Sequence, residues 1–341
     1  MRIIILFTVL LSNLIVSPLT WAKPIAQILN DQAWSFSEPL KIDPLNISGV
    51  VITDNFMALA TDEGNQIQIF KADNKKSWKS INVIQLSDDS EEMDIEALAW
   101  QAPYLYALGS HSAKRKKLKN SLNQKDNIAR LQTIYAEPAR QKLVRLELDS
   151  AARVIQQQSL SIQQELTRHP LLKPFIGLPS KENGIDIEGL AIDGQGRLLL
   201  GFRGPVFRGN IVPILRLKLA KNRFAIKKSK LLYITTAGNG VRGLSEVPLS
   251  KPEQFLVLSG AVGDQPLPYQ VSLWNAENAI TANDTPSDNL IHLCDLPPSS
   301  GKPEGIQFIK KQAHSIDFLI VQDGLKNGQA HLYRCPIKTH G

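Results

Sequence analysis

The chain has 341 residues, of which 43% are hydrophobic and 21% charged, so it can form a packed core and is not an intrinsically disordered polymer. It carries 39 Lys and Arg against 32 Asp and Glu, a formal net charge of +7, and only two Cys. Two Cys exclude a disulfide-built miniprotein and a Cys-rich zinc or iron–sulfur site. The total charge alone does not show where the charge lies or what partner it serves.

The first 22 residues have the pattern of a secretory signal peptide. Arg2 is followed by an apolar run from Ile3 to Val16, and small residues at Thr20 and Ala22 precede the expected cleavage point. The run is shorter than the roughly 20 apolar residues of a membrane span, and no later stretch approaches that length. We therefore expect a periplasmic or secreted protein with residues 23–341 as one mature domain and no membrane span after cleavage. An uncleaved N-terminal anchor is the alternative.

A short phrase recurs five times along the chain and begins an apolar strand in each copy. The copies are Ile47-Ser48-Gly49-Val50, Ile95-Glu96-Ala97-Leu98, Ile187-Glu188-Gly189-Leu190, Val241-Arg242-Gly243-Leu244 and Pro303-Glu304-Gly305-Ile306. Two further strands follow each copy, and four copies have a fourth strand. Repeated four-stranded units predict an all-β fold, a β-propeller of five blades. Six blades is the alternative, because the second interval of 92 residues could contain a degenerate blade.

The fifth unit lacks its fourth strand, because the chain ends at Gly341. The strand-like segment from Ala33 to Ile42 is expected to supply it and close the ring, which would remove exposed strand edges. Two insertions lengthen the second unit. Residues 111–140 are expected to form helix or loop, and residues 161–175 a short helix broken near Pro170.

The positive charge is concentrated in the first of these insertions. Between His111 and Arg130 seven Lys or Arg stand against Asp126 alone, so the rest of the mature chain is formally neutral. The acidic segment from Asp88 to Asp94 should lie at the same edge of the propeller. We expect it to pair at least partly with the insertion, which would form a flap over the channel mouth; a solvated basic loop is the alternative. Because the positive charge is confined to one insertion and the aromatic residues are scattered, we expect no nucleic-acid partner.

The start of each first strand lies beside the end of the second strand in an antiparallel hairpin, so polar residues at both places should share the channel mouth. The first strands supply Glu96, Glu188, Arg242 and Glu304, and the ends of the second strands supply Asp62, Glu63, Ser110, His111, Arg203, Asp264 and Asp323. A Ca²⁺ ion, which prefers several oxygen ligands, is the candidate cofactor, with Glu96, Glu188, Glu304 and Asp323 as the metal ligands. A small anionic ligand would be bound by Arg203, Arg208, Arg242 and Ser110.

The same residues have a structural interpretation. The phrase glutamates could lock neighbouring blades together by accepting backbone N–H groups or by pairing with Arg203 and Arg242. Cys294 and Cys335 lie in strand-like segments, and they form either a disulfide or two separate buried thiols.

Three groups of residues carry a family resemblance. They are Gly109-Ser110-His111-Ser112 with the basic run Lys114-Arg115-Lys116-Lys117, Asp186-Ile187-Glu188-Gly189-Leu190-Ala191 with Gly201-Phe202-Arg203-Gly204-Pro205, and Gly240-Val241-Arg242-Gly243-Leu244 with Leu258-Ser259-Gly260. In these residues the chain resembles a family of exported bacterial proteins known as a domain of unknown function, over residues 46–337. It also distantly resembles the esterase-like phytase propellers, which implies metal-assisted phosphoester hydrolysis.

Two functions are consistent with these patterns. The first is an exported propeller that binds a small anionic ligand, a metal ion or a protein partner at its channel mouth. The alternative is a divalent-metal-dependent hydrolase of phosphoesters, esters or lactones, with His111 as general base, Glu188 at the ion and Arg203 orienting the substrate. Serine-hydrolase, zincin, Walker A and dinucleotide-binding motifs are all absent.

Overall fold

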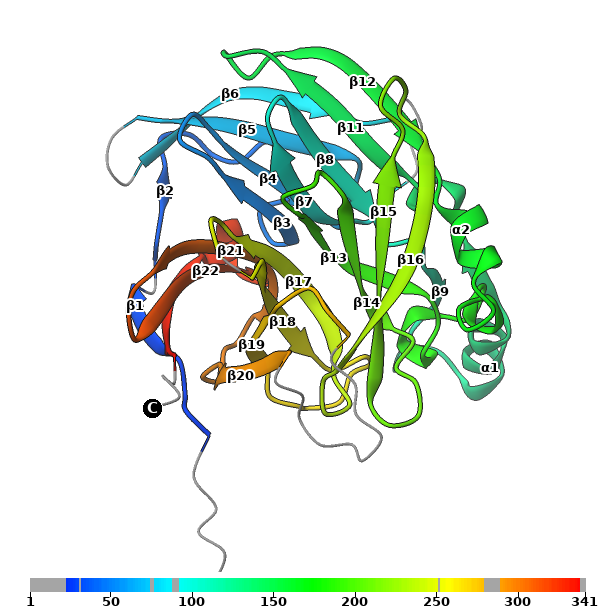
Figure 1. Ribbon diagram of the computed structural model, residues 1–341. Helices are drawn as coiled ribbons and strands as arrows, with labels where there is room; N and C mark the ends of the chain where they lie inside the picture. Colours follow the sequence, from blue (N-terminus) through cyan, green and yellow to red (C-terminus); the bar gives the residue numbers. More distant parts are fainter. Residues whose placement is uncertain are drawn as a thin grey trace, which may run out of the picture.

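The computed structural model describes residues 23–30, 32–73, 77–87, 92–250, 252–278 and 289–337. These residues form five blades of four antiparallel strands around a central axis (Figure 1). The predicted five-bladed propeller is confirmed, and the long second interval contains insertions in place of a sixth blade. The innermost strands contact one another in chain order, and the innermost strand of the fifth blade contacts that of the first.

Each of the first three blades has four strands, which follow one another from the axis outward. The first blade consists of β3 (Ile47–Ile52), β4 (Met57–Thr61), β5 (Gln66–Ala72) and β6 (Ser77–Gln85). The second consists of β7 (Ile95–Gln101), β8 (Tyr104–Gly109), β11 (Leu143–Leu148) and β12 (Val154–Leu160). The third consists of β13 (Asp186–Ile192), β14 (Leu198–Gly204), β15 (Ile211–Leu219) and β16 (Ile226–Thr235).

The last two blades follow the same plan. The fourth consists of β17 (Gly240–Val247), β18 (Gln254–Gly260), β19 (Gln270–Trp274) and β20 (Leu290–Asp295). The fifth consists of β21 (Lys302–Lys311), β22 (Ser315–Asp323), β23 (His331–Pro336) and β1 (Gln27–Asn30). The apolar core is divided into clusters that lie mainly between neighbouring blades.

An N-terminal strand closes the ring, as predicted, but it is not the expected segment. β1 pairs with β23, whereas Ser35–Phe36 forms β2, which runs parallel to β6 of the first blade. Trp34 and Ile42 are buried in the cluster shared by the fifth and first blades. The apolar residues of the segment 33–42 therefore fill this core, which is why the segment looked like a strand in the sequence.

The last two blades are joined by a disulfide between Cys294 on β20 and Cys335 on β23, whose Cα atoms lie 5.8 Å apart. The N-terminal segment spans the same two blades, because the Ala26 N–H donates to the carbonyl of Asp295 at 2.8 Å before β1 pairs with β23. Of the two possibilities left by the sequence, the bonded pair is the one observed.

Removing this disulfide should weaken the closure of the ring. A Cys294→Ser, Cys335→Ser variant is expected to lose about 2–4 kcal/mol of unfolding free energy, because the crosslink restricts the unfolded chain. Thermal unfolding should show a fall of roughly 3–6 °C relative to the oxidised wild type. Reduced wild type should unfold like the variant; equal melting of all three samples would contradict a stabilising disulfide.

The recurring phrase contains a β-bulge in every blade. In the third blade Ile187 pairs with Phe202 and Gly189 with Gly201, so Glu188 has no opposite residue. The same shift occurs at the second residue of the phrase in the first, second and fourth blades, whereas in the fifth blade it lies one residue later, at Gly305, and Glu304 pairs with Val321. A bulge interrupts the ladder and redirects a side chain. The phrase therefore positions the polar residue of each innermost strand near the axis.

The small third residue of the phrase permits close approach of the blades. A Cβ on Gly189 would lie 2.8 Å from Cγ of Leu244, and one on Gly243 would lie 3.1 Å from Cγ2 of Ile306. The apolar fourth residues line a separate 160 Å³ cavity at the other end of the axis, with only a 10 Å³ space between the two ends. A ligand would therefore enter and leave the polar end through one mouth.

The insertions lie on the outside of the second and third blades (Figure 1). Residues 111–140 contain β9 (Ala113–Arg115), α1 (Gln124–Gln132), β10 (Ile134–Ala136) and a 3₁₀ turn at Pro138–Arg140. Residues 161–175 contain α2 (Gln163–Arg168) and, after Pro170, a 3₁₀ turn at Lys173–Phe175. No helix in the described ranges is long and apolar enough to cross a membrane. The expected signal peptide lies outside those ranges.

Candidate metal centre at the channel mouth

A cavity of about 400 Å³ opens at the end of the axis where the phrases begin. Its charged lining comprises eight carboxyl groups and five cationic groups: Asp62, Asp94, Glu96, Asp186, Glu188, Asp264, Glu304 and Asp323, with Arg140, Lys181, Arg203, Arg242 and Lys302. All five blades or the loops beside them contribute. The excess of carboxylates favours a cation over an anion as the primary occupant.

Most of the predicted mouth residues line this cavity. Those that do are Asp62, Glu96, Glu188, Arg203, Arg242, Asp264, Glu304 and Asp323. Arg203 lies beside Glu188, as the hairpin geometry predicted, with Nη1 2.9 Å from Oε1. Four predicted residues lie outside the lining: Glu63, which is exposed, Ser110, His111 and Arg208. Arg208 is exposed in the connector after β14, and Ser110 is buried with its Oγ 2.8 Å from that of Ser112.

His111, the predicted general base, is buried behind the mouth. Its backbone is left-handed, with φ 56°, and its Nδ1 lies 2.8 Å from the carbonyl oxygen of Gly109. Nε2 accepts the Ile162 N–H at 3.4 Å. Burial lowers the pKa of His111 to about 4, so the ring is neutral and both nitrogens are already used. This arrangement joins the second blade to the segment that contains α2 and provides no free nitrogen at the cavity.

Two arginines cross the cavity floor and bind its glutamates. Arg242, which is buried, donates from Nη1 to Oε1 of Glu188 at 2.8 Å and from Nη2 to Oε1 of Glu304. Arg203 donates to the same Oε1 of Glu188. This network joins the third, fourth and fifth blades, as in the structural interpretation of the phrase. The two guanidinium groups bind these glutamates only through terminal nitrogens, and Nε of each arginine is buried without a hydrogen-bond partner among the described residues.

The network leaves several carboxylate oxygens without a hydrogen-bond partner among the described residues. Oε2 of Glu188 and Oε2 of Glu304 are buried and unpaired, and so is Oδ1 of Asp62. A buried unpaired polar atom costs free energy, so such an atom beside a cavity suggests a missing ligand. The arginines therefore bind one carboxylate oxygen of each glutamate, and the other oxygen of each has no hydrogen bond among the described residues.

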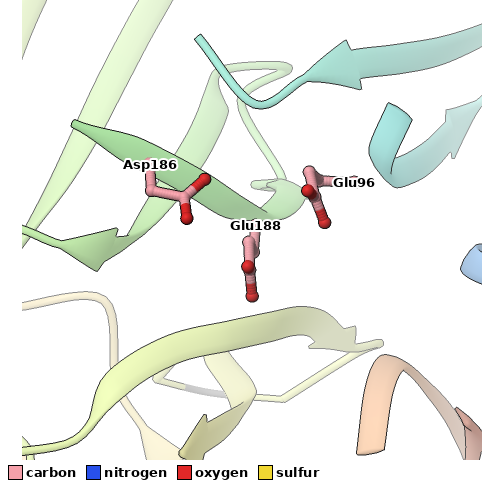
Figure 2. Close-up of side chains that lie close together, drawn as sticks. All are labelled: Glu96, Asp186 and Glu188. Carbon is pink, nitrogen blue, oxygen red and sulfur yellow. The ribbon is translucent and has the colours of Figure 1, made fainter. Parts of the chain in front are cut away.

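Glu96, Asp186 and Glu188 lie close together on one wall of the cavity. Each offers a carboxylate oxygen, and these oxygens lie within 4.8 Å of one another. Glu96 is on β7 and the other two are on the neighbouring β13, and Figure 2 shows the three side chains close together. Within the described residues the Glu96 carboxylate has no ion pair and no hydrogen bond. Three oxygens at this spacing can surround a single divalent cation.

The electrostatics of this wall are unfavourable without a cation. Burial raises the pKa of Glu96 well above its ordinary value, and the negative charge of Glu188 adds to the rise. Burial also raises the pKa of Asp186 to about 8, with Glu188 adding to the rise and Arg203 opposing it. Either a proton or a metal ion must offset this charge at neutral pH.

The other predicted metal ligands lie on a different wall, near the first and fifth blades. Glu304 binds Arg242, and Oδ2 of Asp323 lies 2.6 Å from Nζ of Lys302. Burial raises the pKa of Glu304 to about 7 and that of Asp62 to about 8, and the negative charge of Glu304 adds to the rise at Asp62. This wall therefore combines carboxyl groups of raised pKa with one lysine, and Arg242 connects it to the three-carboxylate cluster by binding both Glu304 and Glu188.

Sequence reasoning missed Asp186, Asp94, Arg140 and Lys302, which also line the cavity. A signal was present, because an aspartate precedes the phrase glutamate by two residues in Asp94-Ile95-Glu96 and Asp186-Ile187-Glu188. Residues two apart on a strand share a face. Asp94 binds Nη1 of Arg140.

The basic insertion pairs with the acidic segment only at its base. Nζ of Lys114 lies 3.5 Å from Oε1 of Glu92, and Arg140 binds both Glu92 and Asp94; residues 88–91 lie outside the described ranges. None of residues 113–137 lines the cavity. The expected flap is therefore wrong, because these ion pairs hold the insertion beside the mouth.

The comparisons with known proteins give a family. A family model described as "Protein of unknown function (DUF3616)" matches residues 46–332. The chain belongs to this family. The match covers all five phrases of this DUF3616 protein and confirms the resemblance to a domain of unknown function. No curated protein matches the sequence significantly.

Solved structures resemble the DUF3616 chain only distantly. An endo-arabinase from Bacteroides thetaiotaomicron VPI-5482 has a TM-score of 0.47 at 13% identity, over 89% of this chain and 98% of that one. Glutaminyl cyclase from Myxococcus xanthus has a TM-score of 0.45 at 8% identity, over 93% and 100%. The α-L-arabinanase of Cellvibrio cellulosa has a TM-score of 0.43 at 10% identity, over 83% and 89%. Likenesses this weak carry no argument about activity.

Proposed function

We propose that the protein binds a divalent cation of the Ca²⁺ class at its channel mouth and uses the bound cation to hold an oxygen-bearing ligand. The observation that carries this proposal is the cluster of Glu96, Asp186 and Glu188, whose oxygens lie within 4.8 Å of one another. The buried, unpaired Oε2 of Glu188 supports it independently.

The chemistry of the lining favours a hard cation. The cavity is lined by carboxylates and contains no His or Cys side chain, so it lacks the nitrogen and sulfur ligands that zinc and copper prefer. Ca²⁺ takes six to eight oxygen ligands, so three carboxylates would leave positions for water or for a ligand. An anionic ligand would then bind through the cation, because Nη1 of Arg203 and Nη1 of Arg242 already bind Glu188.

Thermal unfolding with and without Ca²⁺ tests this proposal. At 100 times its dissociation constant the cation should add about 2.7 kcal/mol, or roughly 4 °C, and EDTA should reverse the gain. Mg²⁺ measured in parallel reports selectivity. A melting temperature that does not change with either cation would contradict the proposal.

The cation effect should grow with pH. The pKa of Asp186 is raised from 3.8 to about 8, so between these values the folded protein holds a proton that the unfolded chain has lost. Without cation, stability should therefore fall as the pH rises through this window. The cation must displace that proton, so its stabilisation should be larger at pH 8.5 than at pH 6. The same melting shift at both pH values would argue against binding at Asp186.

A second candidate function, metal-dependent hydrolysis, is favoured by Asp62. Its carboxyl lines the same cavity as the three-carboxylate cluster, its Oδ1 is buried and unpaired, and its pKa is raised to about 8. A carboxyl group that is protonated at neutral pH can donate a proton to a leaving group while a cation activates water.

Turnover measurements separate this candidate from simple binding. With Ca²⁺ or Mn²⁺ present, hydrolysis of p-nitrophenyl phosphate, p-nitrophenyl acetate or phytate should fall at least about 100-fold in Asp62→Asn. Cation binding should be kept in this variant. A cation-dependent melting shift without any turnover would favour the binding function.

A further inference from the structure

The insertion after β8 has an exposed surface that combines large apolar side chains with cations. Its helix, α1, has no buried residue. Four apolar side chains in and around it are exposed by 56, 47, 41 and 42%: Leu118, Ile128, Leu131 and Ile134. Isolated exposed apolar residues are ordinary, but four within one short insertion mark a candidate contact surface.

Five cations in the same insertion form no ion pair among the described residues: Lys116, Lys117, Lys119, Lys125 and Arg130. Asp126 on α1 bonds Asn123, and two other acidic side chains nearby are occupied by other cations. Glu182 binds Arg115 through two hydrogen bonds, and Glu137 lies 2.9 Å from Nζ of Lys114 and also binds Arg140. We call these five cations and the four apolar residues the basic–apolar surface.

The basic–apolar surface is held in one conformation. Arg130 donates from Nε to the carbonyl of Lys117 at 2.9 Å, and the Asn127 side chain bonds both backbone groups of Lys119. These contacts place one face of α1 against the preceding segment. Ile128 and Leu131, three residues apart on the helix, are left exposed on another face.

We propose that this surface binds the anionic headgroup region of a phospholipid membrane. Unpaired cations are attracted to anionic lipids, and exposed aliphatic side chains gain by burial at the headgroup boundary. A soluble polyanion such as nucleic acid would satisfy the cations but leave the four apolar side chains in water. α1 spans only Gln124–Gln132, so it would lie on the membrane and would not cross it.

Flotation with lipid vesicles tests this proposal on the chain 23–341, in EDTA so that the cation site has no influence. Vesicles of phosphatidylcholine with one quarter phosphatidylglycerol should bind the protein, and pure phosphatidylcholine vesicles should bind it much more weakly. A Lys117→Gln, Lys119→Gln, Lys125→Gln variant should bind roughly 100-fold less tightly. An Ile128→Ser, Leu131→Ser variant should bind roughly 10-fold less tightly.

Matched controls remove the same groups elsewhere. Lys227, Lys228 and Lys230 are exposed on β16, and Ile155 on β12 and Leu249 are 64% and 98% exposed. Substituting these lysines by Gln, or Ile155 and Leu249 by Ser, should leave vesicle binding unchanged. The proposal would be overturned by absent binding, by equal loss in the controls, or by loss in the lysine variant without loss in the apolar variant. The last outcome would indicate a polyanion.

Discussion

Replacing Arg242 by Met is expected to lower the free energy of unfolding by about 3–5 kcal/mol at pH 7. The side chain is buried, and its two terminal nitrogens bind Glu188 and Glu304. The substitution keeps much of the apolar volume but leaves two buried carboxylates with less positive charge. Urea unfolding followed by circular dichroism measures the loss. Arg153→Met is the control: its side chain is 79% exposed beside Asp149, so it should lose less than about 1 kcal/mol.

The loss in Arg242→Met should depend on pH in a defined direction. Arg242 lowers the pKa of Glu304, which burial raises from 4.5 to about 7, so the variant should raise that pKa further. A raised folded-state pKa costs stability above the unfolded value and costs nothing below it. The difference between variant and wild type should therefore shrink as the pH falls from 7 to 4. A difference that stays constant would indicate lost packing.

Replacing Glu96 by Gln is expected to weaken Ca²⁺ binding by at least about 100-fold, because even the outer-shell partners of a metal site contribute about 10- to 100-fold. The variant should also be more stable than the wild type without cation. Glu96 forms no ion pair among the described residues and feels Arg242 only at longer range, and burial raises its pKa well above the ordinary value, so its charge is a cost that Gln removes. Calorimetric titration and thermal unfolding measure the two effects.

The combination of these two effects distinguishes a ligand from a structural residue. If Glu96 had only a structural role, its substitution would make the protein less stable. If it is a metal ligand, the substitution should make the cation-free protein more stable and lower its affinity for Ca²⁺. Asp264→Asn is the control within the same cavity. Its side chain is 70% exposed, and Oδ1 lies 2.5 Å from Nζ of Lys181, away from the three-carboxylate cluster. Calcium affinity that stays unchanged in Glu96→Gln would remove this residue from the site.

The sequence predicted the blades well because each phrase encodes three requirements. A polar residue faces the mouth in four of the five phrases, Gly or Ala allows the blades to meet, and an aliphatic residue closes the far end, as in Glu188, Gly189 and Leu190. The prediction placed the closing strand in the wrong segment, because the apolar residues of segment 33–42 pack in the core between the fifth and first blades. A single sequence does not distinguish an apolar residue in a strand from one that packs under a loop.

The candidate site was predictable only in outline. Hairpin geometry brought Glu188 and Arg203 together correctly, but the expected role of His111 depended on its side-chain direction. Its left-handed backbone turns the ring toward Gly109 and Ile162. No local sequence pattern predicts this backbone conformation. Pairing of the phrase glutamates with Arg203 and Arg242 was among the interpretations of the sequence, but that Arg242 binds both Glu188 and Glu304 depends on how the blades meet at the axis.

The position of a bound cation tests the central claim most directly. Crystals grown with Mn²⁺ as an anomalous substitute for Ca²⁺ would show it in an anomalous difference map. We predict one strong peak at the channel mouth, with oxygens of Glu96, Asp186 and Glu188 at metal–ligand distances of roughly 2.0–2.6 Å. No peak at these three carboxylates, in crystals that contain ample Mn²⁺ at pH 8, would contradict the account.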